Sequence, residues 1–567
     1  MTQSALPGAT PAWHLYVPKL YTTLRQGYDF SALRADLIAG LTVAIVALPL
    51  AMALAIASGT TPDKGLLTAV VAGFLISALG GSRFQIGGPT GAFVVVVFNV
   101  IAQYGYDGLV LATLMAGIAL IIAGYAGLGT WIKYIPQPVV TGFTAGIAVI
   151  IFSSQIRDLL GLTLDKVPAD FLEKCAALWE ARNTVALPAV ALAAIVIAII
   201  LVLRRKAPKM PAFLIAVLVA SLAAYALSLP VDTIGTRFGG IPSTLPLPVL
   251  PAVSLDRMIE LLPSAFTIAF LAGVESLLSA MVADGMTGRR HRSNCELVAQ
   301  GVANTVSALF GGLPATGAIA RTATNIRSGG RTPIAGMAHA MFLLIFILVA
   351  APLASYVPLA SLAGVLVIVA WNMSEVDRLR ELMHAPIGDR LVLLITFLLT
   401  VLVDLTVAIE VGVVLAAILF MHRMADMVAV RHGLILDEEI DDLAPHGAAR
   451  VTERAALPPG VEAFHLRGPL FFGAAGRLTD LLDRTGTWPR VFILRMREVP
   501  FIDATGVDAL ASFVKRCAAH GTGVIVTGIQ PQPKQVLQQM GFGRNQQLQF
   551  VDRFEAALDI AWSKDSV

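Results

Sequence analysis

The sequence predicts a polytopic α-helical membrane protein that ends in a small cytoplasmic α/β domain. Of its 567 residues, 56% are hydrophobic and 14% are charged, and the mean hydropathy is +0.76. An ordinary soluble domain is far less apolar. Long apolar runs recur from Leu37 to Met421, and the sequence becomes polar after that point. Most of the chain is therefore expected to lie in a membrane.

Fourteen membrane spans are predicted, because about 20 apolar residues cross a bilayer as a helix. Two of the fourteen are interrupted, and the last apolar block, 391–421, is divided by Asp404 into two short helices. The other ten are expected near residues 37–57, 66–79, 108–126, 138–156, 184–203, 211–229, 262–283, 296–311, 333–352 and 359–371.

The first interrupted segment considered is 311–325, which is too polar to span a membrane as one helix. Pro314 and Gly317 disfavour a helix, whereas the sequence from Ala318 onward is typical of one. A helix N-terminus with free N–H groups should therefore lie inside the membrane, close to Arg321. Because the helix dipole and the guanidinium both attract negative charge, this segment predicts an anion site.

The second interrupted segment, 85–93, has glycines around Pro89 followed by an apolar run. Segment 85–93 lies about 230 residues before segment 311–325 in the chain. Two interrupted segments at corresponding positions of two halves are typical of a secondary transporter's binding site. The spacing fits an inverted repeat of six or seven spans, and the count of fourteen spans then predicts two repeats of seven, each with one half-helix.

Topology and partner classes follow from the charged residues. An even number of spans places both termini on one side, and the loops on that side hold most of the Arg and Lys, which predicts cytoplasmic termini.

A net charge of +3 without a basic stripe argues against nucleic-acid binding. Three scattered cysteines support neither a disulfide framework nor a metal site. No nucleophile with a base and an orienting group is recognisable, so an enzyme is not expected.

Four segments are expected: an N-terminal cytoplasmic segment (1–35), a membrane domain (36–421), a linker (422–449) and a soluble domain (450–567). In the soluble domain, strand-like runs alternate with helical patterns. Strands are expected at 461–466, 491–496 and 524–527, and helices at 474–484, 506–519 and 533–540.

Several motifs in order resemble the SulP family of sulfate-permease-type anion transporters, and the tail resembles that family's STAS domain. The motifs are Pro62-Asp-Lys-Gly-Leu-Leu-Thr-Ala69, Gly80-Gly-Ser-Arg83, Gly88-Pro89, Ile135-Pro-Gln-Pro-Val-Val-Thr-Gly-Phe-Thr-Ala-Gly146 and Ala320-Arg-Thr-Ala-Thr-Asn325. Within the family, 45–55, 275–280, 284–288 and 369–375 are most similar to bacterial C4-dicarboxylic acid transporters.

The resemblance implies a core domain of spans 1–4 and 8–11 and a gate domain of spans 5–7 and 12–14. The core would carry a small anionic substrate past the gate by an elevator-type movement. It also implies a homodimer among the lipids of the bacterial inner membrane. By position, span 3 would contribute Thr90, Gly91 and Ala92 to substrate binding, and span 10 would contribute Ala318, Ile319, Ala320 and Arg321.

The chain departs from sulfate-type members at two ligand positions, with Leu50 in place of a glutamine and Ala320 in place of a serine. A pocket walled by Leu50, Leu54 and Phe93 favours an organic carboxylate such as succinate, fumarate or aspartate. Sulfate or bicarbonate transport, an uncoupled anion channel and a membrane-anchored signalling scaffold are the alternatives.

Two of these residues also have purely structural interpretations. Arg321 could cap backbone carbonyls instead of touching ligand, although intramembrane charges are functional by default. Thr90 could be an ordinary helix N-cap. Both alternatives stay open from the sequence.

Glu275 lies near the middle of span 8, where an unpaired carboxylate would be costly. By the resemblance, Glu275 and Ser279 occupy the position of a coupling site. A proton is favoured over sodium as the coupling ion, since the sequence does not define the several oxygen ligands that sodium needs. No other cofactor or metal is expected. The structural alternative is a permanent ion pair between Glu275 and Arg321.

In the tail, Val499-Pro-Phe-Ile-Asp-Ala-Thr-Gly-Val507 resembles the turn that carries a phosphorylatable hydroxyl in related anti-sigma-factor antagonists. Asp503 and Thr505 are therefore candidate regulatory residues, and a cytoplasmic partner protein could bind there. The simpler interpretation of Thr505 is a helix N-cap.

Overall fold

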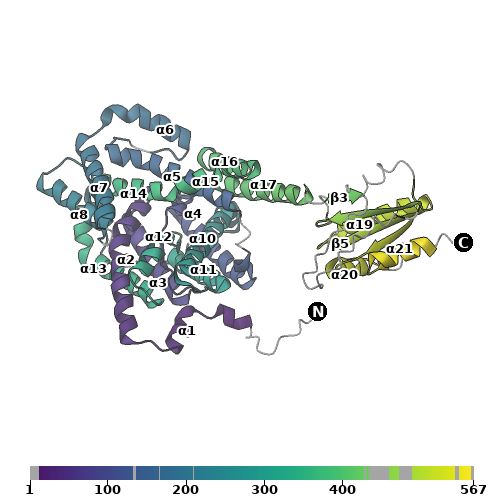
Figure 1. Ribbon diagram of the computed structural model, residues 1–567. Coiled ribbons are helices and arrows are strands. Elements are labelled where there is room, and N and C mark those ends of the chain that lie inside the picture. The colour runs from purple at the N-terminus through teal and green to yellow at the C-terminus, as the bar shows by residue number, and fades with distance from the viewer. Residues whose placement is uncertain are drawn as a thin grey trace. The chain divides into compact units, whose positions relative to one another are not determined.

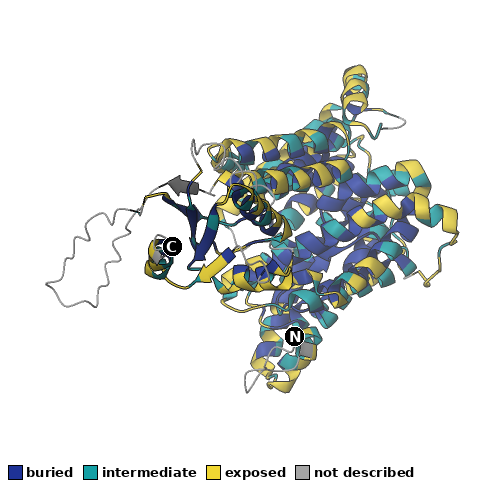
Figure 2. Ribbon diagram, turned by 90° about the vertical axis from the view of Figure 1, so that its right-hand side faces the viewer, coloured by how far each residue is buried: buried dark blue, intermediate teal, exposed yellow. Residues whose placement is uncertain are grey.

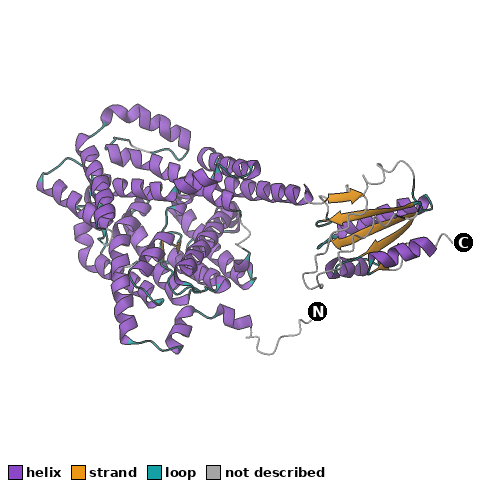
Figure 3. Cartoon of the chain, viewed as in Figure 1, coloured by secondary structure: helices purple, strands orange, loops and turns teal. Residues whose placement is uncertain are grey.

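The computed structural model of the protein divides into two compact units, residues 1–414 and 415–567 (Figure 1). The first unit is almost entirely helical, whereas the second combines a sheet with helices (Figure 3). The structure describes residues 12–131, 136–164, 167–207, 210–244, 246–426, 429–432, 457, 459–471, 488–542 and 548–563.

Two groups of helices make up the first unit, as the packing between elements shows. Helix α17 joins the second group, because Gly412 within it lies against Thr396 and Val139. The group called the core domain contains α2 (Phe30–Ala57), α3 (Pro62–Leu79), α4 (Ala92–Tyr125), α10 (Leu255–Thr287), α11 (Ser293–Leu309), α12 (Ile319–Arg327) and α13 (Ile334–Ala354). The group called the gate domain contains α5 (Gln137–Leu160), α7 (Leu187–Lys206), α8 (Ala212–Ala226), α14 (Leu359–Met373), α16 (Ile387–Leu402) and α17 (Leu405–Asp426). Shorter helices are α1 (Lys19–Arg25), α6 (Phe171–Glu180), α9 (Ile234–Phe238) and α15 (Val376–Leu382).

The predicted membrane spans correspond to helices of this unit. Nine helices within the described residues are long and apolar enough to cross a membrane. The shorter α8, α11, α12 and α16 occupy the remaining predicted segments. Large apolar side chains such as Leu222, Val349 and Leu353 are exposed on the outward faces, as a lipid-facing surface requires. Figure 2 shows buried residues inside the helical unit and exposed ones around it.

Two local breaks explain how the helices divide. Spans 3 and 4 form one long α4, but Gly105 within it has non-helical angles (φ 74°, ψ 177°), which glycine tolerates. The last apolar block breaks between α16 and α17, where the Asp404 carboxylate accepts the Thr406 N–H at 2.9 Å. The predicted division at Asp404 is therefore confirmed.

Each repeat contains a two-residue strand in place of the missing half of a helix. Strand β1 (Gly87–Gly88) pairs antiparallel with β2 (Thr316–Gly317), with Gly87 opposite Gly317. The paired strands join segments that are about 230 residues apart in the chain. Both interrupted segments of the prediction are thus present, and they meet each other.

The second unit is built on a five-stranded sheet of order β3-β4-β5-β6-β7. Its strands are β3 (Ala429–His432), β4 (Val461–Arg467), β5 (Val491–Glu498), β6 (Gly523–Thr527) and β7 (Leu548–Val551). Only the β3–β4 pair is antiparallel among these described strands. Helices α19 (Ala504–Ala519), α20 (Pro531–Gln539) and α21 (Phe554–Ser563) accompany them.

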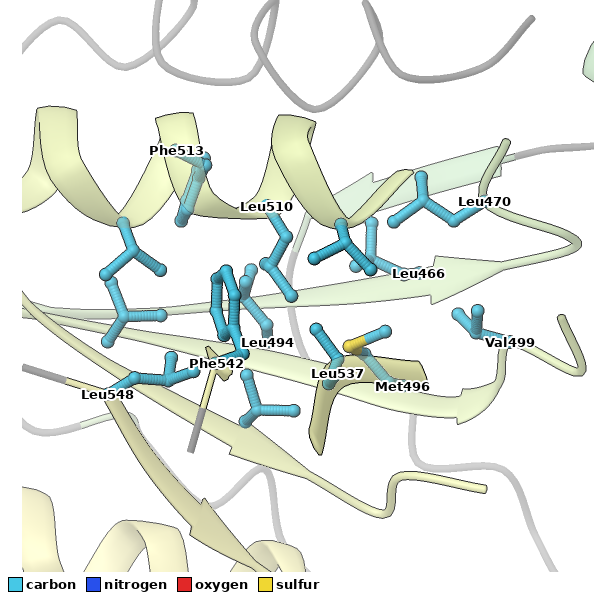
Figure 4. Close-up of a cluster of buried hydrophobic side chains, with 14 of the residues drawn as sticks. Leu466, Leu470, Leu494, Met496, Val499, Leu510, Phe513, Leu537, Phe542 and Leu548 are labelled. Atoms are coloured by element: carbon cyan, nitrogen blue, oxygen red, sulfur yellow. The ribbon is translucent and has the colours of Figure 1, made fainter. Parts of the chain in front are cut away.

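A buried apolar cluster holds this unit together. Leu494 and Met496 of β5 meet Leu510 and Phe513 of α19 in it (Figure 4). The three predicted strands and the helices near 506–519 and 533–540 are present. The predicted helix at 474–484 lies outside the described residues. Strand β3 comes from the segment expected to be a linker, and the domain boundaries stay predictions.

Candidate functional site

The strand pair brings the two half-helices of the repeats end to end. The Ala318 N–H, just before α12, donates to the Ile86 carbonyl, just before β1, at 2.8 Å. Helix α4 begins at Ala92 and α12 at Ile319. Two helix N-termini therefore lie next to one strand pair inside the core domain.

Neither half-helix has a side-chain cap at its N-terminus. The N-cap residues are Gly91 for α4 and Ala318 for α12, and no side chain bonds to the first turn of either helix. Within the described part of the chain, the N–H groups of residues 90–92 and 319–321 have no recorded acceptor. Uncapped N–H groups with aligned helix dipoles attract an anion.

Arg321, in the first turn of α12, lies across the strand pair. Its side chain is buried, with 2% of the residue exposed. Nη2 donates to the Pro89 carbonyl at 2.5 Å, while Nε and Nη1 have no hydrogen-bond partner among the described residues. Nη1 lies so close to Gly88 that a Cβ there would overlap it. Arg321 thus caps a carbonyl, as one alternative proposed, and keeps two nitrogens unpaired.

Glu275 of α10 pairs with Thr90 and not with Arg321. The Thr90 hydroxyl donates to Glu275 Oε2 at 2.8 Å. No ion pair between Glu275 and Arg321 is recorded in the described residues. Thr90 is also not the N-cap of α4, since Gly91 holds that position. A coupling candidate and a substrate-binding candidate are therefore linked directly.

Ser279, one turn further along α10, has a different partner. Its hydroxyl donates to Thr322 Oγ1 at 3.1 Å, and the same oxygen accepts the Ile86 N–H at 3.1 Å. Ser279 therefore fixes α12 and the start of β1 to α10. Among the described residues it makes no hydrogen bond to Glu275.

Other polar residues of the interrupted segments attach them to α10. The Gln85 amide donates to the Ser276 carbonyl at 2.9 Å, and the Thr316 hydroxyl donates to the Ala272 carbonyl at 3.0 Å. Thr322, Gln85 and Thr316 were not among the residues predicted to form the site. A polar residue inside a predicted span was the available signal for all three.

The predicted apolar wall is only partly enclosed. Leu54, Ala92, Phe93 and Ala318 are buried, Leu50 and Ile319 are half-buried, and Ala320 is exposed. On the gate side, Gly91 contacts two residues that the sequence did not indicate. A Cβ at Gly91 would lie 2.6 Å from Met373 Sδ of α14 and 3.3 Å from Ile151 Cδ1 of α5.

In the described residues, no group of three or more His, Cys, Asp or Glu side chains could hold a metal ion. The carboxylate at the site is that of Glu275, which accepts the Thr90 hydroxyl. An anion could therefore bind to two helix N-termini and a guanidinium, and a proton could bind to one carboxylate.

The candidate regulatory residues lie at the start of α19. The Asp503 carboxylate accepts the Gly506 N–H at 2.8 Å and is the N-cap of this helix. Thr505 is the second helical residue and is exposed. The N-cap interpretation of Thr505 is therefore wrong, because Asp503 occupies that position.

Comparisons with known proteins match this architecture. Residues 33–396 match the model of the sulfate permease family, and residues 454–557 match the STAS domain. YvdB of Bacillus subtilis, provisionally named a sulfate transporter, is 42% identical over 518 residues, which are 91% of this chain and 95% of YvdB. The bicarbonate transporter BicA of Picosynechococcus sp. is 31% identical over 533 residues, covering 90% and 91% of the two chains.

Solved structures also resemble the chain. The transmembrane domain of a cyanobacterial BicA has a TM-score of 0.62 and 33% identity, covering 68% of this chain and 98% of that domain. The structure of solute carrier 26 member A9 has a TM-score of 0.84 at 17% identity, covering 98% of this chain and 94% of the other, and shows the fold alone. None of these relatives is named for dicarboxylates, so they do not support that part of the prediction.

Proposed function

The chain belongs to the sulfate permease family of anion transporters, and we propose that it is a secondary active transporter of a small inorganic oxyanion, sulfate or bicarbonate. The names of the relatives support these two anions over the C4-dicarboxylates. The apolar residues Leu50 and Ala320 had suggested an organic acid, but one is half-buried and the other is exposed. They give no enclosed apolar pocket as an argument for that substrate.

The observation that carries the proposal is the unpaired part of Arg321. A buried guanidinium with two unpaired nitrogens is costly, because each nitrogen has lost water without gaining a partner. An oxyanion would supply the missing acceptors, since a guanidinium binds two oxygens in one plane. The uncapped N-termini of α4 and α12 add further donors.

The protonation state of Glu275 would decide which anion charge the site matches. Two helix N-termini contribute together about one positive charge, and Arg321 contributes another. With Glu275 ionised, the site would carry about one net positive charge and match bicarbonate. With Glu275 protonated, it would carry about two and match sulfate. Sulfate would therefore enter together with a proton, whereas bicarbonate would need no proton at this residue.

The transport movement is proposed to be of the elevator type, in which the core domain slides past the gate domain. A multi-pass protein with bacterial relatives fits the plasma membrane. Cytoplasmic termini, a homodimer and a partner of the second unit complete the proposal. Each rests on the sequence, through the distribution of basic residues or through the family resemblance.

The test is uptake of labelled sulfate, bicarbonate and succinate into proteoliposomes, with and without a pH gradient and with and without sodium. Arg321→Ala should abolish uptake, while the protein stays folded by size-exclusion chromatography. Arg321→Lys keeps the charge without the planar pair of donors, so it should recover only part of the affinity.

Glu275→Gln separates coupling from binding. Because glutamine is a fixed neutral mimic, the variant should exchange sulfate across the membrane but should not accumulate it with a pH gradient. Thr90→Val is the matched variant, since it removes the hydroxyl and leaves the carboxylate. Undiminished accumulation in Glu275→Gln would exclude Glu275 as the coupling group. Uptake that requires sodium would assign the residue to a cation site instead.

A further inference from the structure

A separate cavity of about 550 Å³ lies between the core and gate domains. Its walls include α3 and α4 of the core and α5, α6 and α9 around the gate. Val94 and Val95, one turn beyond the start of α4, border it, whereas none of the predicted substrate-binding residues does. Its volume lies within the range of about 300–1,000 Å³ that small-molecule sites have.

Positive charge dominates the lining of this cavity. Among the described residues, it is bordered by Lys64, Arg157, Lys174 and Arg237, against one carboxylate, that of Asp158. Asp158 is already used, because its Oδ1 lies 2.7 Å from Nη1 of Arg237. No ion pair is recorded for the ammonium of Lys64 or Lys174 in the described part of the chain.

Lys174 is the residue with the most unusual environment. Only 3% of this lysine is exposed, and its Nζ lies 5.6 Å from the centre of the Phe98 ring. Burial lowers the pKa of its ammonium, and neighbouring Asp170 compensates only in part. An unpaired ammonium is costly to bury, so a lysine in this position is stabilised by an anion.

We propose that this cavity is a second anion site, which holds the transported oxyanion on the outer side before it reaches Arg321. The inference rests on the proposed function for the identity of the anion and for the side of the membrane. Lys174 and Lys64 supply the charge from opposite domains, and the hydroxyls of Thr60 and Thr61 supply further donors. Because both domains line the cavity, an elevator movement would change its shape and release the anion.

A purely structural interpretation of Lys174 is the cation–π contact with Phe98. That contact offsets part of the cost of burying the charge, because a ring face attracts a cation. It does not explain why Lys64, on a different helix, borders the same cavity with its Nζ 5.3 Å from the Tyr106 ring. Two ammonium groups that face one cavity without a carboxylate partner among the described residues point to a ligand.

The direct test is chemical modification of Lys174 in the purified full-length protein, followed by mass spectrometry. Sodium sulfate and sodium bicarbonate are compared with sodium gluconate at equal ionic strength. One of the two oxyanions should slow acetylation of Lys174 by at least about fivefold, as a bound ligand at saturation does. Exposed Lys515 of α19 is the internal control and should react at the same rate throughout.

The Arg321→Ala variant separates this inference from the proposed function. It should lose transport but keep the protection of Lys174, because the two sites have no residue in common. Equal acetylation of Lys174 with and without oxyanion would overturn the second site, whatever the transport result. Loss of protection together with transport in Arg321→Ala would also overturn it, since the anion would then be bound at Arg321.

Transport kinetics provide the second measurement. Lys174→Gln should raise KM for uptake from the outer side about tenfold with kcat unchanged, which corresponds to about 1.4 kcal/mol of binding free energy. Lys174→Arg should restore the low KM, and Arg182→Gln, which removes an exposed charge from the same loop region, should not change it. An unchanged KM in Lys174→Gln, or an equal rise from both sides, would contradict an outer site.

Discussion

Replacement of Gly88 by alanine tests whether Arg321 lies across the strand pair. Gly88 has φ +150°, a conformation that residues with a side chain rarely adopt. An added Cβ would also lie well under 3.0 Å from Arg321 Nη1, whereas its distance of 3.5 Å to the Ala69 backbone is ordinary. Gly88→Ala should therefore strain the backbone and displace the guanidinium, without disturbing α3.

The expected cost has two parts. A non-glycine residue in this backbone region costs about 1–3 kcal/mol. Displacing the guanidinium breaks its bond to the Pro89 carbonyl, and a hydrogen bond to a charged group contributes about 1.5–3 kcal/mol. In the Arg321→Ala background only the first part remains. The two substitutions should therefore couple by about 1.5–3 kcal/mol in a double-mutant cycle.

The assay is the free energy of unfolding of the detergent-purified protein, together with oxyanion affinity for the parent and Gly88→Ala. Gly105→Ala is the matched control, because Gly105 has φ 74° and open space around the added Cβ. It should show the backbone strain without the coupling. If Gly88→Ala costs the same with and without Arg321, the guanidinium does not lie over Gly88 and the geometry of the site is wrong.

Three further predictions concern the second unit. Deletion of 450–567 should lower transport or expression without changing the anion selected in an uptake panel, because the candidate anion-binding residues all belong to the first unit; a changed preference would contradict this. The hydrogen bond from Arg467 lowers the pKa of the Glu498 carboxyl from its ordinary value, so this pair stabilises the folded unit above the ordinary pKa and loses its effect as pH falls through the lowered one. Hydrogen exchange of β4 and β5 should show that loss in the parent and not in Glu498→Gln. Asp503→Ala should cost the unit about 1 kcal/mol as a lost N-cap, whereas Thr505→Ala should leave its unfolding midpoint unchanged.

Most of the helical architecture was predictable, because bilayer thickness imposes a length on every apolar segment. The interruptions were predictable for a related reason, since glycine and proline inside an apolar run cannot continue a helix. Asp404 marked the last break correctly because its carboxylate caps the next helix. These features depend on residues close together in sequence.

Contacts between distant segments were not predictable in the same way. The Thr90–Glu275 bond joins residues 185 positions apart, and it depends on how α4 packs against α10. Met373 and Ile151 meet Gly91 for the same reason, and an apolar residue in a span gives no sign of which neighbour it contacts. Strand β3 has four residues and pairs with β4 through its backbone, so composition could not indicate it.

In the second unit, the residue at which α19 begins decides whether Asp503 or Thr505 is its N-cap. Asp503 and Thr505 are both residue types that cap helices. Because α19 begins at Ala504, the carboxylate is at the N-cap and the hydroxyl is inside the first turn. A shift of two residues in the expected start would reverse the roles, and sequence patterns do not locate helix ends that accurately.

The hydrogen bonds around the two half-helices give a physical reason for the proposed elevator movement, which would also have to break the 2.7 Å bond between Thr267 of α10 and Thr406 of α17. Both half-helices are tied to each other and to α10 by bonds inside the core domain, through the β1–β2 pair, Arg321, Ser279 and the Thr90–Glu275 bond. The contacts of Gly91 with the gate domain are instead apolar, with Met373 and Ile151. Apolar contacts have no preferred register, whereas hydrogen bonds must be broken when their partners separate. A site held in this way can therefore move as one body with the core, and its least costly sliding surface is the side that faces Met373.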